Sequence, residues 1–380
     1  MDKKVKKIKF LHCADIHMDS PFSSLSNALL AKKRRQTLKD VFSKIIDIAL
    51  TENVNFLLIC GDLFEHEYTD LSSINFINEC FKKIPNTKVL IACGNHDPAI
   101  SNSYYSNYDW NENVLVFKSH ISYAYFDEFD TYIYGSSFCA FEENECTIPN
   151  FDILDKNGIN IFVTHGTLGF DNANTKYNPI DFNFIKDLGM DYVALGHFHN
   201  TFIKENIYNP GSPEPLGFDE CGKHGVFLVS IDKTSDLKLD AKFIDTNITS
   251  YNVLDVNIPN IDNDLLVINS IKEKIAVEIA DPKNALLQVN LNGYIQNGTA
   301  LDLDYIYSSI CNDLFYLKII DNTTPDYDWE FISKEPGLRG LFVSKMLKKI
   351  ASAQDDEAKK TLYLAMHYGV QAIDNNKIEL

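Results

Sequence analysis

The chain has 380 residues, of which 45% are hydrophobic and 23% are charged, an ordinary composition for a soluble globular protein. Its length predicts two domains rather than one compact core. The formal net charge of -18 excludes a generally basic surface, so a nucleic-acid partner would have to be held by local basic patches, by metal ions or by another subunit.

The cysteines and the hydropathy pattern bear on the cellular compartment. The 8 cysteines show no CxxC pair and no regular spacing, which favours a reduced, cytoplasmic protein over a disulfide scaffold. No apolar stretch is long enough to span a bilayer, and no signal-peptide pattern follows the basic start of the chain. We therefore expect a cytoplasmic protein with no membrane contact.

The first part of the chain alternates between strands and helices. Residues 7–60 predict a strand, a helix near 29–52 and a second strand. A second helix is expected near 70–83, and a third strand ends at Cys93. This alternation is typical of βαβ units with a parallel sheet.

Shorter elements follow. The predicted ones, in chain order, are strands at 114–117, 122–126, 131–134 and 159–164, a helix near 180–188, a strand at 191–195, and a hairpin of strands at 224–231 and 238–244. We expect the catalytic domain to end near 245. Beyond it, a strand around Leu287, Val289 and Leu291, and helices at 300–317, near 338–350 and at 355–372, predict a second domain over residues 246–380.

Five short polar motifs stand at or after the ends of apolar runs. They are D-x-H at Asp15 and His17, G-D at Gly61 and Asp62, G-N-H-D at 94–97, H-G at His165 and Gly166, and G-H-x-H at 196–199. Oxygen and imidazole donors without a thiolate cluster suit two divalent metals and argue against a closed structural zinc site. If the backbone there is extended, Asp15 and His17 leave the same face of their strand, and so do His197 and His199.

The order of these motifs resembles that of the calcineurin-like metallophosphoesterases, and most closely the branch that holds the SbcD nuclease subunits and the YhaO proteins. The closer match lies in residues 11–17, 61–64 and 209–213, and residues 19–22 and 338–342 look more like YhaO. The resemblance implies an α/β fold, a four-layer α-β-β-α sandwich over residues 1–245, with a smaller C-terminal α+β domain for capping or partner binding.

The resemblance also implies a role for each motif residue. One metal ion would be held by Asp15, His17, Asp62 and His199, and the other by Asp62, Asn95, His165 and His197, with Asp62 bridging the two. His96 would be the catalytic histidine that contacts the scissile phosphate or protonates the leaving oxygen. Manganese is expected, and iron, zinc and magnesium are also compatible with these donors.

The implied activity is metal-dependent hydrolysis of DNA phosphodiesters, as a 3′–5′ exonuclease and endonuclease in DNA repair. The implied partners are DNA, an SbcC-like or YhaN-like ATPase subunit and a second copy of the chain. Two alternatives stay open: hydrolysis of a small phosphodiester or phosphomonoester, which the acidic charge favours, and a non-catalytic scaffold. One departure concerns Glu65, because the nuclease branch often has a histidine or aspartate there.

Two further groups of residues allow a functional and a structural interpretation. The basic run at 32–35 could meet phosphates, although a solvated helix face is the simpler prediction. Aromatic side chains at Tyr104, Tyr105, Tyr108 and Trp110 could stack on bases, or they could pack a loop.

Overall fold

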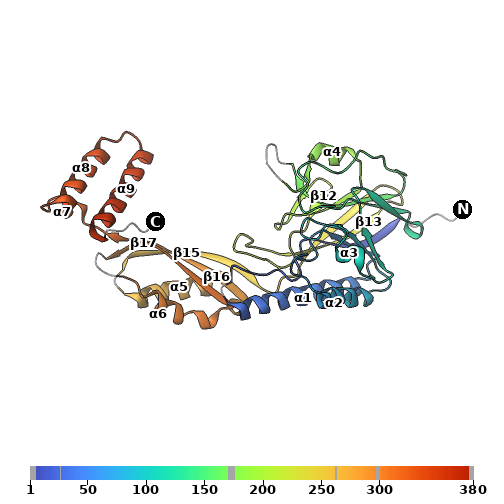
Figure 1. The fold of residues 1–380 in the computed structure, drawn as a ribbon, viewed down its shortest axis with the longest axis horizontal. Helices are drawn as coiled ribbons and strands as arrows, with labels where there is room; N and C mark the ends of the chain where they lie inside the picture. Colours follow the sequence, from blue (N-terminus) through green and yellow to red (C-terminus); the bar gives the residue numbers. More distant parts are fainter. Residues whose placement is uncertain (1–5, 26, 170–175, 262, 297–299, 376–380) are drawn as a thin grey trace. The chain divides into compact units, whose positions relative to one another are not determined.

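A computed structural model describes residues 6–25, 27–169, 176–261, 263–296 and 300–375. The chain divides into two compact units (Figure 1). The first holds residues 1–253 with the short segments 281–287 and 314–316, and the second holds the rest. Among the described residues, no helix combines the length and the apolar character needed to cross a membrane.

Two six-stranded sheets form the centre of the first unit. The first sheet has the order β14-β13-β1-β2-β3-β4, with bounds Lys238–Asp245, Gly225–Asp232, Lys7–Cys13, Phe56–Cys60, Lys88–Ala92 and Val114–Phe117. The second has the order β11-β12-β10-β7-β6-β5, with bounds Phe202–Lys204, Ile207–Asn209, Tyr192–Gly196, Ile159–His165, Thr131–Gly135 and Ser122–Phe126. Strands β1 to β4 run parallel, as do β6, β7, β10 and β12.

Helices cover the outer faces of both sheets (Figure 1). The helices α1 (Ala28–Thr51) and α2 (Leu71–Lys82) lie on the first sheet, and α4 (Phe182–Asp187) lies on the second. Short elements complete the unit: α3 (Tyr104–Asn107), η1 (Asp127–Phe129), and β8 (Thr167–Leu168) paired with β9 (Pro179–Ile180). The predicted four-layer α-β-β-α sandwich is confirmed.

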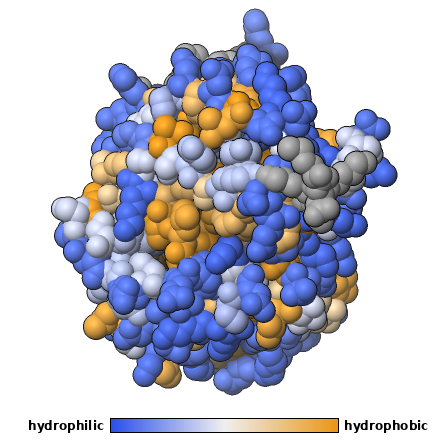
Figure 2. All heavy atoms as spheres, turned by 90° about the vertical axis from the view of Figure 1, so that its right-hand side faces the viewer, coloured by the Kyte–Doolittle hydropathy of each residue, from blue (hydrophilic) through white to orange (hydrophobic). Residues whose placement is uncertain are grey.

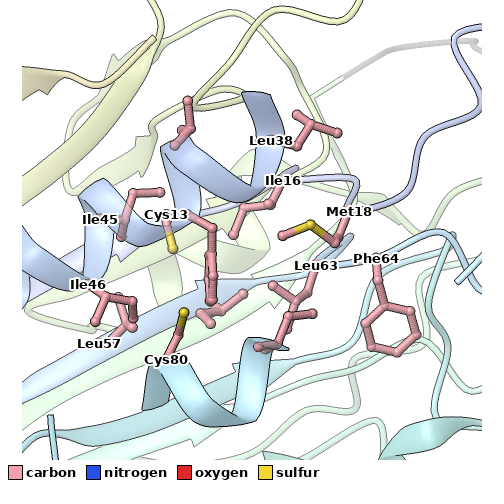
Figure 3. Packing of buried hydrophobic residues seen from close by; sticks show 14 of the residues in the cluster. Cys13, Ile16, Met18, Leu38, Ile45, Ile46, Leu57, Leu63, Phe64 and Cys80 are labelled. Atoms are coloured by element: carbon pink, nitrogen blue, oxygen red, sulfur yellow. The ribbon is translucent and has the colours of Figure 1, made fainter. Parts of the chain in front are cut away.

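The strand sequences explain why two sheets stack. In β2 every residue is buried, and the side chains alternate between two separate cores. Leu57 and Ile59 face α1 and α2, whereas Phe56 and Leu58 face the second sheet. Figure 3 shows the first of these cores, where side chains of α1 meet Cys13 and Leu57 from the sheet. A continuous apolar run is what a strand covered on both faces requires.

The outer surface contrasts with these cores. The face shown in Figure 2, which is the right-hand side of Figure 1, is mostly hydrophilic with apolar patches near its middle. The described chain nevertheless exposes some large apolar side chains, among them Tyr68, Tyr123 and Phe141. Single exposed apolar residues need no explanation, but several around one cavity do.

The second unit contains a three-stranded sheet and helices. Its sheet has the order β15-β16-β17, and the elements with their bounds are β15 (Ser250–Ile261), α5 (Asp264–Glu278), η2 (Pro282–Asn284), β16 (Ala285–Gln296), α6 (Leu303–Ser308), η3 (Cys311–Asp313), β17 (Tyr316–Asp326), α7 (Trp329–Ile332), α8 (Leu338–Ser352) and α9 (Asp356–Asn375). Parts of β15, β16 and β17 and the turn η2 fall in the first unit. The predicted helices α8 and α9 and the strand through Leu287 are confirmed.

The prediction of a helix over 300–317 is wrong beyond its first turns. The helix α6 ends at Ser308, and β17 already begins at Tyr316. The hydroxyl groups of Ser308 and Ser309 donate to the backbone carbonyls of Asp304 and Tyr305, four residues earlier. Such bonds compete with helix continuation, so two adjacent serines favour an end there.

Candidate metal centre

The motif residues lie where the carboxyl ends of the parallel strands of both sheets meet. Asp15 and His17 follow β1, Asp62 follows β2, and Asn95 and His96 follow β3 in the first sheet. His165 ends β7, and His197 and His199 follow β10 in the second sheet. Polar groups cluster at this edge because it is where parallel strands turn into loops in α/β sheets.

Unusual backbone angles place several of these side chains. Asp15, His17, Asp62 and His197 all have positive φ angles, of 52°, 49°, 51° and 110°. The condition of an extended backbone is therefore not met at the D-x-H pair, although Asp15 and His17 still place ligand atoms in one group with His199. Non-glycine residues with positive φ are uncommon and gather at functional sites.

Close packing between the sheets demands glycine at two motif positions. A Cβ atom on Gly196 would overlap the carbonyl oxygen of Cys60 in the other sheet. Gly61 has a φ angle of +80°, and a Cβ atom there would overlap the His165 imidazole. Glycine thus lets the two halves of the ligand set approach each other.

Two histidines of the set face each other through their Nε2 atoms. The Nε2 atoms of His17 and His199 lie 3.2 Å apart. Nδ1 of His17 donates to Glu65 at 2.7 Å, and Nδ1 of His199 donates to Glu220 at 2.6 Å. Since each ring holds its proton at Nδ1 in the neutral form, two lone pairs point at one another. A cation between them would turn this repulsion into two ligand bonds.

The same arrangement occurs around His165. Its Nδ1 donates to the carbonyl oxygen of Cys60 at 2.8 Å. Its Nε2 lies 3.1 Å from Oδ1 of Asn95 and 3.3 Å from Oδ2 of Asp62. When this ring is neutral with its proton at Nδ1, three acceptors therefore converge, which again fits a cation. The ring of His197 lies beside that of His165, with centroids 5.1 Å apart, and its backbone N–H donates to Asp15.

The pKa shifts of the buried groups also favour a cation site. Burial raises the pKa of Asp15. Burial alone would lower the pKa of His165, but the Asp62 carboxylate raises it to about 9. For His199 the hydrogen bond to Glu220 likewise outweighs burial and raises the pKa to about 9. The buried carboxylates thus stabilise positive charge in the cluster, and divalent cations would supply that charge.

Glu65 connects a candidate metal ligand to the candidate catalytic histidine. One carboxylate oxygen accepts from Nδ1 of His17, and the other accepts from Nδ1 of His96 at 2.8 Å. Burial would raise the pKa of Glu65, but these two hydrogen bonds lower it to about 2. Where the nuclease branch often has a histidine or aspartate, this chain thus has Glu65, whose carboxylate orients two imidazoles.

Asp97, the last residue of the G-N-H-D motif, holds the surrounding loops. Its buried carboxylate accepts from the backbone N–H groups of Asp62, Leu63 and Gly94, and from the hydroxyl of Tyr105. Tyr105 is fully buried, so stacking of this side chain on a base is excluded, and loop packing is the correct interpretation. The ring of Trp110 lies 6.0 Å from that of Tyr105 in the same packed group.

Sequence reasoning did not identify Glu220. Its carboxylate bonds to His199, to the hydroxyl of Ser212 and to the backbone N–H of Leu216. Nε2 of the buried His224 donates to the backbone carbonyl oxygen of Glu220. One feature of the sequence could have pointed to Glu220. It lies in the loop after β12, which begins with the family-like residues 209–213.

The interpretation of the basic run at 32–35 fails at Arg34. This side chain is fully buried and pairs with the equally buried Glu214. It also donates to Thr249 and to the carbonyl oxygen of Pro215, and it lies over the ring of Phe22. Arg34 is thus neither solvated nor available to phosphate.

A further group of potential ligands lies apart from the cluster, in His120, Cys139 and Glu143. The Glu143 carboxylate already accepts from His120, from the backbone N–H of Cys139 and from the hydroxyl of Thr147. These contacts close the loop between Cys139 and Thr147, which accounts for the group without a metal ion.

Comparison with known proteins gives the following matches. A family model described as calcineurin-like phosphoesterase matches residues 8–201. The uncharacterized metallophosphoesterase YhaO of Bacillus subtilis is 30% identical over 237 residues, which cover 59% of this chain and 57% of YhaO. The chain thus spans little more than half of that relative.

Two more distant relatives carry functional names. The SbcD component of the nuclease SbcCD of Staphylococcus epidermidis is 22% identical over 270 residues, covering 62% of this chain and 69% of the relative. The DNA double-strand break repair protein Mre11 of Saccharolobus solfataricus is 22% identical over 383 residues, covering 94% of each chain.

Proposed function

Because the chain belongs to the calcineurin-like phosphoesterase family, we propose that it is a two-metal phosphodiester hydrolase that cuts DNA. The observation that carries the proposal is the convergence of acceptor atoms from Asp62, Asn95, His165, His17 and His199 beside His96. DNA as substrate is supported by relatives named as a nuclease component and a DNA repair protein. The finer proposal is a manganese-dependent 3′–5′ exonuclease and endonuclease that serves DNA repair in the cytoplasm.

The residues would hold the two ions in two overlapping groups. The first ion would take Asp15, His17, Asp62 and His199, and the second would take Asp62, Asn95, His165 and His197. The fit is supported by imidazoles whose Nδ1 atoms already donate to Glu65, Glu220 and the carbonyl oxygen of Cys60, which leaves Nε2 as the ligand atom. Bound divalent cations would supply Lewis acidity at the phosphoryl oxygens and lower the pKa of water.

The chain's own residues supply orientation and a proton donor. The side chain of His96 is 43% exposed, whereas its neighbours His17 and Asp62 are each 3% exposed, so His96 faces the space where an ester would lie. Glu65 accepts a hydrogen bond from Nδ1 of His96, which fixes the orientation of the ring and leaves Nε2 as the atom that can donate a proton. The backbone N–H of His96 donates to Asp62 and fixes the loop. His96 is thus placed to protonate a leaving oxygen.

A small phosphodiester or phosphomonoester is the second candidate substrate. The net charge of -18 favours it, because a protein that binds DNA by itself normally presents a basic surface. An SbcC-like or YhaN-like ATPase subunit could supply the basic surface instead, and we propose residues 246–380 as the capping and partner-binding domain. A second copy of the chain is a further proposed partner, and a non-catalytic scaffold is the remaining alternative function.

One experiment tests the proposal. The purified chain is assayed with Mn²⁺, Fe²⁺, Zn²⁺ or Mg²⁺ on single- and double-stranded DNA, cyclic nucleotides and bis-p-nitrophenyl phosphate, with His96→Ala as the control. We expect DNA to be cut far more efficiently than the small esters. If the chain cuts no DNA, alone or with the ATPase partner, the proposal of DNA as substrate is wrong. If His96→Ala keeps the activity of the wild type, His96 is not the proton donor.

A further inference from the structure

A pocket of about 310 Å³ opens directly beside His96. Its lining residues are Glu65, His66, Glu67, Tyr68, Asn95, His96, Phe141, Glu142 and Tyr177. They come from the loops after β2, after β3 and after β6, and from the segment before β9. The pocket therefore shares His96, Asn95 and Glu65 with the candidate metal centre, and a group bound in it would be connected to the reacting phosphate.

Three large aromatic side chains around this pocket are exposed. Tyr68 is 57% exposed, Phe141 is 42% exposed and Tyr177 is 37% exposed. Single exposed apolar residues are common, but three around one concavity indicate a surface that is covered when a ligand binds. Aromatic faces of this kind are the standard support for a stacked base.

Neighbouring side chains hold two of the aromatic rings. The ring of Phe141 meets the ring of His66 edge to face, with centroids 5.6 Å apart. The backbone N–H of His66 donates to the carbonyl oxygen of His96, which ties this wall to the catalytic loop. The ring of Tyr177 lies 5.4 Å from the ring of His197, a proposed metal ligand. The contacts with His66 and His197 thus fix the rings of Phe141 and Tyr177 relative to the candidate metal centre.

The charge of the pocket argues against a second phosphate as its occupant. Three carboxylates line it, from Glu65, Glu67 and Glu142, and no lysine or arginine stands among the described lining residues. Lys176 pairs with both oxygens of Glu142 at 2.9 and 3.0 Å, and Glu65 accepts hydrogen bonds from His17 and His96. Away from His96 the lining offers a second phosphate no lysine or arginine, whereas a flat uncharged group needs neither.

Resting on the proposed function, we propose that this pocket binds one unpaired nucleobase of the substrate, next to the scissile phosphate. The base stacks on the aromatic walls while the phosphate lies at the metal centre. A base inside a duplex is paired and stacked, so it must leave the helix before it can enter. The enzyme therefore acts on single-stranded ends or unpaired nucleotides in preference to intact duplex.

The test compares substrates that differ only in a base. The full-length enzyme with Mn²⁺ hydrolyses the dinucleotide TpT and two analogues, in each of which a tetrahydrofuran replaces one of the two thymine-bearing sugars. The scissile phosphodiester is the same in all three. We expect one of the two analogues to lose about 5- to 150-fold in kcat/KM with the wild type, the range expected for one stacked base.

Variants then assign that loss to the pocket. Phe141→Ala lowers kcat/KM for TpT by the same factor and cleaves TpT and the analogues equally, and Phe141→Tyr restores the preference for TpT. The matched control is Tyr123→Ala, because Tyr123 is 55% exposed on β5 and does not line the pocket. Equal cleavage of all three substrates by the wild type, or an unchanged preference in Phe141→Ala, overturns the proposal.

A separate readout distinguishes this inference from the proposed function. If the wild type cleaves neither TpT nor bis-p-nitrophenyl phosphate, the proposed function fails. The pocket is then judged by calorimetric binding of thymidine 5′-monophosphate to the full chain. The base pocket is supported if the wild type binds thymidine 5′-monophosphate and Phe141→Ala weakens this binding at least fivefold. Absent binding, or binding that Phe141→Ala leaves unchanged, overturns it.

Discussion

The carboxylate of Glu65 lies 2.8 Å from Nδ1 of His96, and its other oxygen accepts from Nδ1 of His17. A single side chain thereby fixes the ring orientation of the proposed acid and of a proposed metal ligand. A glutamine at this position can accept through one atom only, because its amide nitrogen is a donor.

Glu65→Gln should therefore lower both metal affinity and activity, by about 10- to 100-fold, as changes to residues that support metal ligands usually do. Calorimetric titration with Mn²⁺ and rates on bis-p-nitrophenyl phosphate measure the two effects. At saturating Mn²⁺ the activity loss should not add to that of His96→Ala, since both changes then act on the same imidazole. Glu79→Gln, an exposed carboxylate on α2, is the control. Additive losses with unchanged Mn²⁺ affinity would contradict the positioning role.

Metal ions should stabilise the folded chain. The acceptor atoms that face one another around His165, Asn95 and Asp62 gain a common partner when cations bind. At about 100 times the dissociation constant, one ion adds about 2.7 kcal/mol to the free energy of unfolding. Thermal unfolding with Mn²⁺ and with EDTA measures the shift. Asp62→Ala should remove it, and a melting temperature that does not respond to Mn²⁺ in the wild type would speak against the centre.

The buried pair of Arg34 and Glu214 should matter for stability rather than for catalysis. Arg34→Ala leaves the Glu214 carboxylate buried without its cation, which typically costs about 3–5 kcal/mol. Urea unfolding in EDTA measures this loss, and Lys33→Ala, an exposed neighbour on α1, should stay within about 0.5 kcal/mol of the wild type. The double variant Arg34→Met with Glu214→Leu should regain much of the loss. If Arg34→Ala left the free energy of unfolding unchanged, this would show that the pair does not form in solution.

His12 should make stability depend on pH. It is fully buried, with Tyr192 and the carbonyl oxygen of Leu195 as partners, and burial lowers its pKa from 6.5 to about 3. The unfolded chain therefore binds a proton that the folded chain excludes. The stabilisation is complete above pH 6.5 and falls as the pH drops towards 3, by at most about 1.4 kcal/mol per pH unit.

The measurement compares the wild type with His12→Gln, which cannot titrate. The advantage of the wild type should shrink by about 2 kcal/mol between pH 7.5 and pH 5 in urea unfolding with EDTA present. An advantage that stays constant over this range would mean that His12 is protonated in both states or in neither.

Much of the first unit was predictable because of how its strands are buried. A parallel strand covered on both faces must be apolar throughout, so β2 and β3 are visible as unbroken runs. The helices α1 and α2 carry apolar residues at helical spacing and were predicted to within one or two residues. The second unit was less predictable: β15, α5 and β17 were not predicted, although β15 alternates buried and exposed residues from Leu254 to Ile258.

By itself the sequence determined which donors follow which strands, and hence that Asp15, Asp62, Asn95 and His165 belong to one edge of an α/β sandwich. This was possible because the carboxyl ends of parallel strands share an edge. Only the tertiary structure decided that Glu65 and Glu220 orient the histidines, that Arg34 is buried, and that aromatic side chains from distant loops enclose a pocket beside His96. Such relationships join residues far apart in the chain through packing and hydrogen bonds, which leave no periodic pattern in the sequence.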